Sequence, residues 1–373
     1  MFRFSDDWSL GTFLFFVLIG LTVSFFCKIG TENKGKGNSG FFFFLAFLIL
    51  FLVESLRSVN VGVDTEEYVD VFREAHLSGY QAFLIKPFEP LFMFYIYITS
   101  RITDNYIFLF ACNAVIKQTA FITFVKKYWK KGDSFLFLPL FVINFQYELA
   151  AMRSALAVAF ILYAFVYIDS RKYFLSILFS FIAIGFHYTA VFALAIIVFR
   201  LALLYKKDRV SIKMLVLLMM ATAIVINAST IFLQGFVQEN TVYGGYVDEL
   251  GSGWLGYWYL VLVALMSISI LSKQFKKKER FNTNDLVNLI MIGCLPVFVV
   301  LGAYRIPKYF LMCRNVTIKD YYTGLVKSQR DPQTKAILKL GGFVLLILLL
   351  LFFSGRMNSG GVYELNPMVV SFF

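Results

Sequence analysis

The chain holds three arginines that stand apart from its basic clusters, namely Arg57, Arg153 and Arg305. Each borders a long apolar run, so each guanidinium is expected near the boundary of a membrane, where an ionisable group is costly unless it is paired or functional. A planar guanidinium can bind two oxygens of a diphosphate at once. The three arginines therefore indicate a site for an anionic, lipid-linked substrate. The alternative is that they reach lipid headgroups or pair with Asp64, Glu89 or Glu148.

Proton transfer is the second kind of chemistry that the sequence offers. His187 is one of two histidines in the chain and lies in the turn 185–189 between two apolar runs. A neutral imidazole at a wet membrane boundary can take a proton from a substrate hydroxyl near neutral pH. The carboxylates Asp64, Glu89 and Glu148 are rival bases. The alternative for His187 is a hydrogen bond that only stabilises the turn.

Metal chemistry has weaker support. The adjacent acidic pairs Asp6-Asp7 and Glu66-Glu67 could hold a divalent ion, but such pairs are also common on solvated surfaces. The cysteines stand singly, without the spacing of a metal site: Cys27, Cys112, Cys294 and Cys313. The sequence also lacks a Gly-rich phosphate loop, which disfavours an ATP-driven machine. We expect an activity that needs neither a metal nor a cofactor.

Long apolar segments must position these residues. The chain is 59% hydrophobic and 16% charged, with a mean hydropathy of +0.73, which is typical of a membrane protein. The sequence therefore predicts an all-α polytopic membrane protein with a single transmembrane domain over residues 1–373. A span needs about 20 apolar residues, which gives about twelve spans, the first of them retained: 9–27, 41–56, 105–125, 134–148, 152–168, 172–186, 189–205, 212–232, 257–272, 286–303, 307–326 and 336–353.

Clusters of Lys and Arg in the short loops indicate the orientation of these spans. The clusters fall on one side, the cytoplasmic side, if every predicted span crosses. We interpret the segment 88–102 as an interfacial helix on the outer face, because a further crossing there would move the cluster 126–131 outside. The outer face then receives the segment 57–104, the loop 233–256 and the tail 354–373. The net charge of +12 thus reflects orientation and not binding to nucleic acid.

The chain resembles the EpsG/Wzy-type polysaccharide polymerase family over most of its length. The resemblance rests on an ordered set of short pieces: Arg57 with Gly62-Val63-Asp64-Thr65 and Tyr68, Phe88-Glu89-Pro90-Leu91-Phe92, Met152-Arg153-Ser154-Ala155-Leu156-Ala157, Phe186-His187-Tyr188-Thr189-Ala190, and Tyr304-Arg305 with Lys308-Tyr309-Phe310. The chain departs from the family at Met152, where the family commonly has Gln.

The resemblance implies a GT-C-like membrane enzyme of the bacterial inner membrane. Such an enzyme joins undecaprenyl-diphosphate-linked repeat units of O-antigen, capsule or exopolysaccharide at the outer leaflet. Its partners are the lipid-linked donor and acceptor glycans and membrane lipid, with a chain-length regulator as a further candidate. Alternatives are a flippase of the same lipid-linked units, or the ligase that transfers finished chains.

On this interpretation the candidate residues take three roles. The arginines Arg57, Arg153 and Arg305 bind the diphosphate. His187, or failing it Asp64 or Glu148, deprotonates the acceptor hydroxyl. The sugar cleft is shaped by Glu89, Tyr68 and Tyr309.

Overall fold

The computed structural model describes residues 10–62, 64–85, 88–140, 151–205, 282–288, 290 and 311–357. This part of the chain is built from helices and connecting turns and holds no β-strand, so the predicted all-α fold is confirmed for it. The chain divides into two compact units, one of Met1–Leu194 with Tyr322–Phe373 and one of Ala195–Tyr321. The candidate site lies in the first unit.

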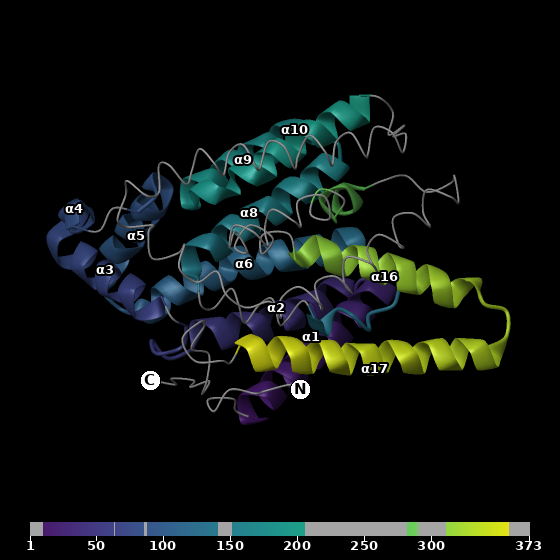
Figure 1. The fold of residues 1–373 in the computed structure, drawn as a ribbon. Coiled ribbons are helices and arrows are strands. Elements are labelled where there is room, and N and C mark those ends of the chain that lie inside the picture. The colour runs from purple at the N-terminus through teal and green to yellow at the C-terminus, as the bar shows by residue number, and fades with distance from the viewer. Residues whose placement is uncertain are drawn as a thin grey trace, which may run out of the picture. The chain divides into compact units, whose positions relative to one another are not determined.

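A row of helices forms the body of the first unit (Figure 1). Helix α1 packs against α2, α2 against α6, α6 against α8, and α8 against α9. The short connections within the pairs α1–α2 and α8–α9 make their helices antiparallel neighbours. The bounds in chain order are α1 Leu10–Glu32, α2 Ser39–Ser55, α6 Tyr106–Tyr128, α8 Met152–Asp169 and α9 Tyr173–Phe186.

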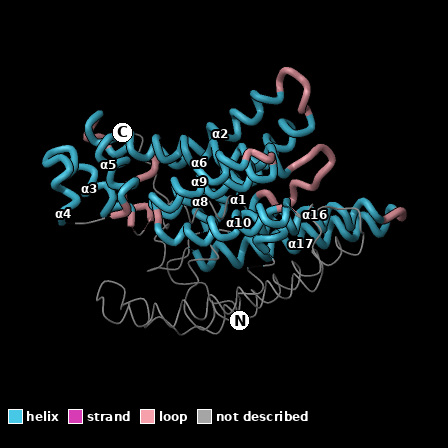
Figure 2. The backbone as a smooth tube through the Cα atoms, turned by 90° about the horizontal axis from the view of Figure 1, so that it is seen from above, coloured by secondary structure: helices cyan, strands magenta, loops and turns pink. Residues whose placement is uncertain are grey.

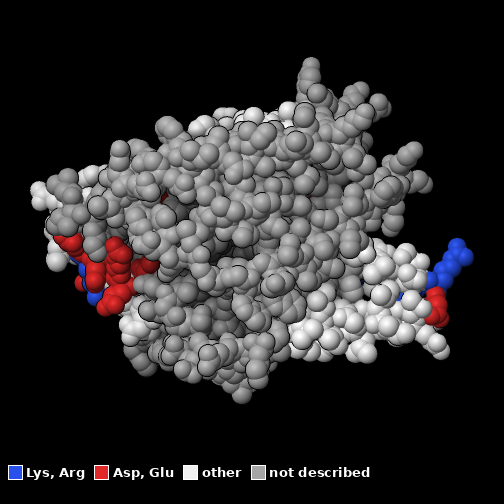
Figure 3. All heavy atoms as spheres, in the orientation of Figure 1, with Lys and Arg blue, Asp and Glu red and all other residues white. Residues whose placement is uncertain are grey.

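Shorter helices lie at one end of this row in both views (Figures 1 and 2). They are α3 (Thr65–Ser78), a 3-10 turn (Gly79–Gln81), α4 (Ala82–Ile85) and α5 (Pro90–Ile102). Helix α3 is amphipathic: it buries Tyr68, Val69 and Phe72 and exposes Glu66, Glu67, Asp70 and Glu74. Figure 3 shows this acidic surface where α3 lies. The acidic pair Glu66-Glu67 is therefore part of a solvated helix face.

Four of the described helices are long and apolar enough to cross a membrane, namely Phe13–Glu32 of α1, α6, α8 and Pro332–Leu350 of α17 (Pro332–Met357). Helices α2 and α9 and the segment Tyr188–Ala202 are shorter and apolar. The last of these joins a 3-10 turn (Tyr188–Ala190) to α10 (Val191–Tyr205). Helix α16 (Leu311–Ser328), at the predicted span 307–326, carries several charged residues and does not qualify. These helices fit a membrane protein.

The other predicted spans and segments fall wholly or partly beyond the described residues. The spans 212–232 and 257–272 and the loop 233–256 lie outside them, and the spans 134–148 and 286–303 lie only partly within. The predicted tail begins inside α17, which continues to Met357. The number of twelve spans and the GT-C-like fold therefore stay predictions.

The predicted helix at 88–102 is present as α5, which begins at Pro90 and has 13 residues. A helix of that size is about 20 Å long, shorter than the ~30 Å hydrocarbon core of a bilayer. Helix α5 packs against α3 and α9. Its interfacial placement on the outer face stays a prediction.

A buried polar cluster joins α2 to α6 inside the row. The ammonium of Lys117 pairs with the carboxylate of Glu54, and the Gln118 amide donates to the same carboxylate at 2.9 Å. All three residues are buried. Arg57, just after α2, is 2% exposed, and its guanidinium lies 4.5 Å from the Phe110 ring centroid. Removing one partner of such a buried pair leaves an uncompensated charge, so these contacts fix α2 against α6.

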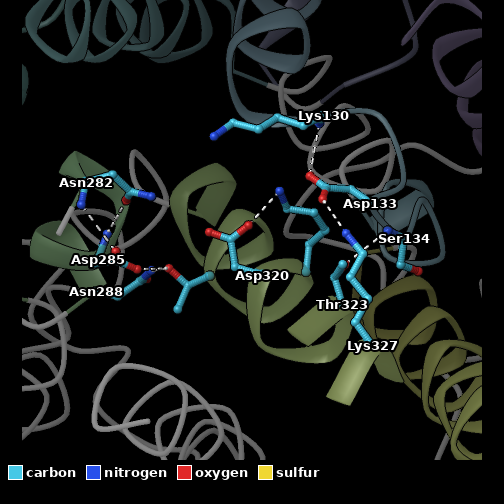
Figure 4. Close-up of polar contacts among 11 residues, drawn as sticks. Lys130, Asp133, Ser134, Asn282, Asp285, Asn288, Asp320, Thr323 and Lys327 are labelled. Carbon is cyan, nitrogen blue, oxygen red and sulfur yellow. Dashed lines mark hydrogen bonds and ion pairs between the residues drawn. The ribbon is translucent and has the colours of Figure 1, made fainter. Parts of the chain in front are cut away.

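The second unit has its own buried polar contacts among its described residues (Figure 4). The Asn288 amide donates to the Thr317 hydroxyl at 2.7 Å and to the Cys313 carbonyl at 3.1 Å. The Thr317 hydroxyl in turn donates to Asp285 at 3.3 Å. These bonds tie the segment 282–288 to α16.

Candidate active site

Four separate segments bring their predicted site residues together at the end of the row beside α3 and α5. Tyr68 comes from the first turn of α3, Glu89 directly precedes α5, Arg153 lies in the first turn of α8, and His187 directly follows α9. Local sequence sets two of these positions. Pro90 occupies the first position of α5, where its missing N–H costs nothing, so Glu89 becomes the cap. His187 caps the C-terminal end of α9 and has an extended backbone conformation, so the helix stops there.

Glu89 is the centre of the site. Its side chain is 5% exposed, and each carboxylate oxygen has a partner from a different segment. Arg153 donates from Nη1 to Oε2 at 2.8 Å, and the Nδ1 of His187 lies 2.5 Å from Oε1. Burial alone would raise the pKa of Glu89, but the His187 hydrogen bond and the Arg153 charge outweigh it and lower the pKa to about 2. Glu89 is therefore ionised at neutral pH.

The ionised state of Glu89 fixes the tautomer of His187. A carboxylate has no proton to give, so the Nδ1–H of His187 must be the donor in this bond. The neutral ring then carries its lone pair on Nε2. The His187 side chain is 26% exposed, so a substrate can reach it. A carboxylate behind the ring also stabilises the imidazolium that forms when Nε2 takes a proton.

Arg153 is held on several sides and still offers donors. Its Nε donates to the Tyr68 hydroxyl at 3.1 Å, and its guanidinium lies 4.7 Å from the Phe88 ring centroid. With Nη1 bound to Glu89, Nη2 makes no hydrogen bond to any residue in the described ranges. The side chain is 28% exposed. A fixed, partly exposed guanidinium with donors to spare suits an anionic ligand.

Packed aromatic rings next to Arg153 hold the residues of the site in place. The rings of Tyr68, Phe88 and Phe92 meet pairwise at centroid distances of 5.4 to 5.9 Å. The contacts of Phe92 with Tyr68 and with Phe88 are edge-to-face, an arrangement that stabilises beyond the burial of the rings. Burial raises the pKa of Tyr68 to about 12, although the charge of Arg153 acts against it. Tyr68 therefore keeps its proton at neutral pH and positions Arg153 as a neutral hydroxyl.

A close approach of α5 and α9 sets the spacing between Glu89 and His187. A Cβ built on Gly185 would lie 2.9 Å from the Cβ of Leu91, closer than real Cβ contacts come. Leu91 lies two residues after Glu89, and Gly185 lies two residues before His187. Only glycine fits at this contact, so Gly185 allows the two side chains to meet.

We expect Gly185→Ala to destabilise the protein by about 1 to 3 kcal/mol, because the added methyl forces two helices apart. Thermal unfolding in detergent measures this. Gly40→Ala on α2 is the matched control, since a Cβ there has no atom within 4 Å, and it is expected to be neutral or slightly stabilising. Equal unfolding midpoints for the two variants would contradict the assigned role of Gly185.

The other predicted site residues have different positions. Asp64 is the half-buried cap of α3, near enough for its charge to affect Tyr68. Arg57 packs against Phe110 of α6, as described above. The remaining predicted residues lie outside the described part of the chain: Glu148, Arg305 and Tyr309.

Two contributors were not predicted from the sequence as site residues. Phe88 covers one face of the Arg153 guanidinium, and Gly185 permits the contact between α5 and α9. Both stand within a few residues of a predicted one, Phe88 before Glu89 and Gly185 before His187. Their position beside the reactive side chains was the signal that could have revealed them.

The comparisons with known proteins agree with the resemblance in the sequence. The model of the EpsG family matches residues 40–366, a range that includes all the residues of the site described above. EpsG is a Wzy-type polymerase family. No curated protein and no solved structure matches the chain.

Proposed function

The chain belongs to the EpsG family, and from this premise we propose that it joins lipid-linked oligosaccharide repeat units into a polysaccharide. The donor and acceptor are undecaprenyl-diphosphate-linked glycans of an O-antigen, capsule or exopolysaccharide. The enzyme works at the outer leaflet of the bacterial inner membrane, within a GT-C-like fold of about twelve spans. The observation that carries the proposal is the Glu89 carboxylate, which joins Arg153 to His187.

The bond-forming step uses His187 as the base. Its Nε2 takes the proton of an acceptor hydroxyl as that oxygen attacks the anomeric carbon of the donor. The bond between this carbon and the diphosphate oxygen breaks, and undecaprenyl diphosphate leaves with the bonding electrons. Glu89 stabilises the imidazolium through the bond at Nδ1. Asp64 and Glu148 are the alternative bases.

Arg153 acts on the leaving group. Negative charge grows on the diphosphate as the bond breaks, and a fixed donor aimed at growing charge stabilises the transition state. The contacts with Glu89, Tyr68 and Phe88 hold the guanidinium in place before the substrate arrives. In this proposal Arg57 and Arg305 also bind the diphosphate. The cleft for the sugars is shaped by Glu89, Tyr68 and Tyr309, and a chain-length regulator and membrane lipid are further partners.

A flippase of the same lipid-linked units is the main alternative, and it would need charges along a path through the membrane. Besides Arg57, which is buried against Phe110, the buried charges between α2 and α6 include Lys117 and Glu54, which pair with each other and are 2% and 1% exposed. A closed pair of this kind supports the packing of two helices and not an open path.

We expect the purified protein in nanodiscs to build a product ladder from the undecaprenyl-diphosphate repeat unit with EDTA present. Arginine side chains stabilise the leaving group in this proposal, so chelation should not change the rate. Nanodiscs without the protein are the control. Loss of the ladder on chelation would contradict metal independence. If no ladder forms while the same protein moves the lipid-linked unit across proteoliposomes, the protein is a transporter.

A further inference from the structure

A cavity of about 400 Å³ opens between the loop 132–136, the last turns of α16 and the first half of α17. All of its walls belong to the first unit. It is distinct from the candidate active site. Tyr128, the last residue of α6, donates to Asp169, the last residue of α8, at 2.9 Å, so both helices end on the side from which the loop 132–136 follows. Arg153 lies at the opposite end of α8, about 25 Å away.

The walls of the cavity are tied together by hydrogen bonds and packing. The Ser134 N–H donates to the Thr323 hydroxyl at 3.0 Å, which holds the loop to α16 (Figure 4). The Phe137 ring packs edge-on against Tyr322 at 5.3 Å, and the Tyr322 hydroxyl donates to the Leu338 carbonyl of α17 at 3.3 Å. A Cβ on Gly342 would lie 2.6 Å from the Tyr322 ring, so α16 and α17 touch at this point. The cavity is therefore preformed.

The charge of the cavity is positive. Lys327 and Lys339 line it together with a single carboxylate, Asp133. Lys327 is 58% exposed, and its ammonium lies 3.8 Å from Asp133, longer than a hydrogen bond. Figure 4 shows Lys327 extending from α16 toward this carboxylate. Lys339 is exposed and has no ion pair within the described ranges. An anion placed between the two ammonium groups would complete the charge balance.

An apolar surface begins where the lysines end. Along α17, residues Leu340, Phe343, Val344 and Ile347 are 40 to 65% exposed and lie on one stripe at helical spacing. Phe343 belongs both to this stripe and to the cavity wall. The stripe lies within the candidate span Pro332–Leu350. The site thus joins a positive pocket to a surface that suits a hydrocarbon chain.

We propose that this cavity binds an anionic glycerophospholipid, with its phosphate between Lys327 and Lys339 and an acyl chain along the α17 stripe. The loops at this end carry basic clusters, such as 126–131, so the lipid belongs to the cytoplasmic leaflet, whose anionic headgroups attract basic residues. The site is independent of the proposed polymerase activity. It offers a lipid contact on the membrane face opposite to the active site.

The test measures binding of dioleoylphosphatidylglycerol to the delipidated protein by native mass spectrometry, with dioleoylphosphatidylcholine as the neutral probe. We expect the wild type to retain the anionic lipid selectively. The double variant Lys327→Gln with Lys339→Gln should bind it about thirtyfold more weakly. The matched control is Lys34→Gln with Lys36→Gln, which removes the same charge from exposed residues of the α1–α2 loop. This control should bind like the wild type.

Three outcomes overturn the proposal. If the Lys327/Lys339 variant and the Lys34/Lys36 variant bind the anionic lipid equally weakly, the lipid is attracted to the basic surface in general and there is no specific site. Equal binding of the anionic and neutral lipids means that the lysines do not select charge. Displacement of the bound lipid by soluble pyrophosphate or by undecaprenyl diphosphate at equal concentration means that the pocket binds a free anion or the substrate lipid. Each variant is first checked for a single size-exclusion peak, so misfolded protein is excluded from the comparison.

Discussion

Glu89→Gln is expected to slow polymerisation by about 10² to 10⁴-fold, the usual contribution of a positioned acid or base. The substitution keeps the shape of the side chain but replaces one oxygen by an NH2 group. That group must face either Arg153 or His187, which are both donors to the present carboxylate. Toward Arg153, a donor then meets a donor in a buried place. Toward His187, the NH2 group favours the tautomer in which Nδ1 accepts, which leaves the proton on Nε2 and removes the base. The product ladder with the undecaprenyl-diphosphate repeat unit measures the rate.

A matched control separates this effect from the general loss of a negative charge. Glu66→Gln makes the same chemical change on the exposed face of α3 and should leave the rate unchanged. A variant that lacks both Glu89 and His187 tests whether the two act as a unit. If they do, Glu89→Gln with His187→Ala should be no slower than His187→Ala alone, because linked catalytic residues are not additive. If the double variant is slower than His187→Ala by the full factor that Glu89→Gln loses alone, the proposal that Glu89 and His187 act as a unit is contradicted.

The pH dependence of stability reports the same carboxylate. The folded protein lowers the pKa of Glu89 from 4.5 to about 2. Its stabilising contribution is therefore fully present above about pH 4.5 and is lost as the pH falls toward 2, where the folded carboxylate takes up its proton. Glu89→Gln should lack this part of the acid dependence. Since Glu89 stays ionised above this range, a loss of activity between pH 8 and 5 has to come from another group.

The long apolar helices of the first unit could be predicted because apolar run length and turn residues carry the information locally, whereas α3 (Thr65–Ser78) was not predicted as a helix. The predicted span 152–168 is observed as Met152–Asp169, and the predicted helix 88–102 begins at Pro90. These boundaries depend on residues within a turn or two of one another. Arg153 and His187 could also be chosen as candidate site residues from the sequence, since an arginine or histidine beside an apolar run is unusual.

Pairing of an arginine with Asp64, Glu89 or Glu148 is an alternative that the sequence offers, but which of them pair could not be predicted, because that depends on how helix ends far apart in sequence meet. Glu89 is predicted as a residue of the sugar cleft and as a rival base, and its two oxygens bind Arg153 and His187. The guanidinium of Arg57, a predicted diphosphate ligand, also lies over the Phe110 ring. Phe110 lies in α6, far from Arg57 in the sequence, so the residues near Arg57 do not predict this contact. The contact of Gly185 with Leu91 likewise requires knowing that α5 crosses α9.

Arg153→Lys is expected to lower kcat by about 10² to 10³-fold, the usual cost of removing a transition-state donor, and to raise KM as well. Lysine keeps the positive charge beside Glu89 but loses the planar fork. A single ammonium cannot hold Glu89, Tyr68 and a diphosphate oxygen in the geometry that Nη1, Nε and Nη2 provide. The stacking on Phe88 is lost with the guanidinium plane. The effect should fall on kcat because charge grows on the leaving diphosphate during the reaction.

Comparing the ladder kinetics of Arg153→Lys and Arg153→Ala distinguishes charge from geometry. If geometry dominates, both variants lose most of their activity, and lysine recovers little. Arg73→Lys is the matched control, because Arg73 is an exposed arginine of α3 whose guanidinium lies 5.8 Å from the Tyr106 ring centroid. It should keep wild-type kinetics. Arg153→Lys with unchanged kcat and KM and a lowered unfolding midpoint would mean that the guanidinium only ties α8 to α3 and α5. The diphosphate would then have to be bound by Arg57 or Arg305.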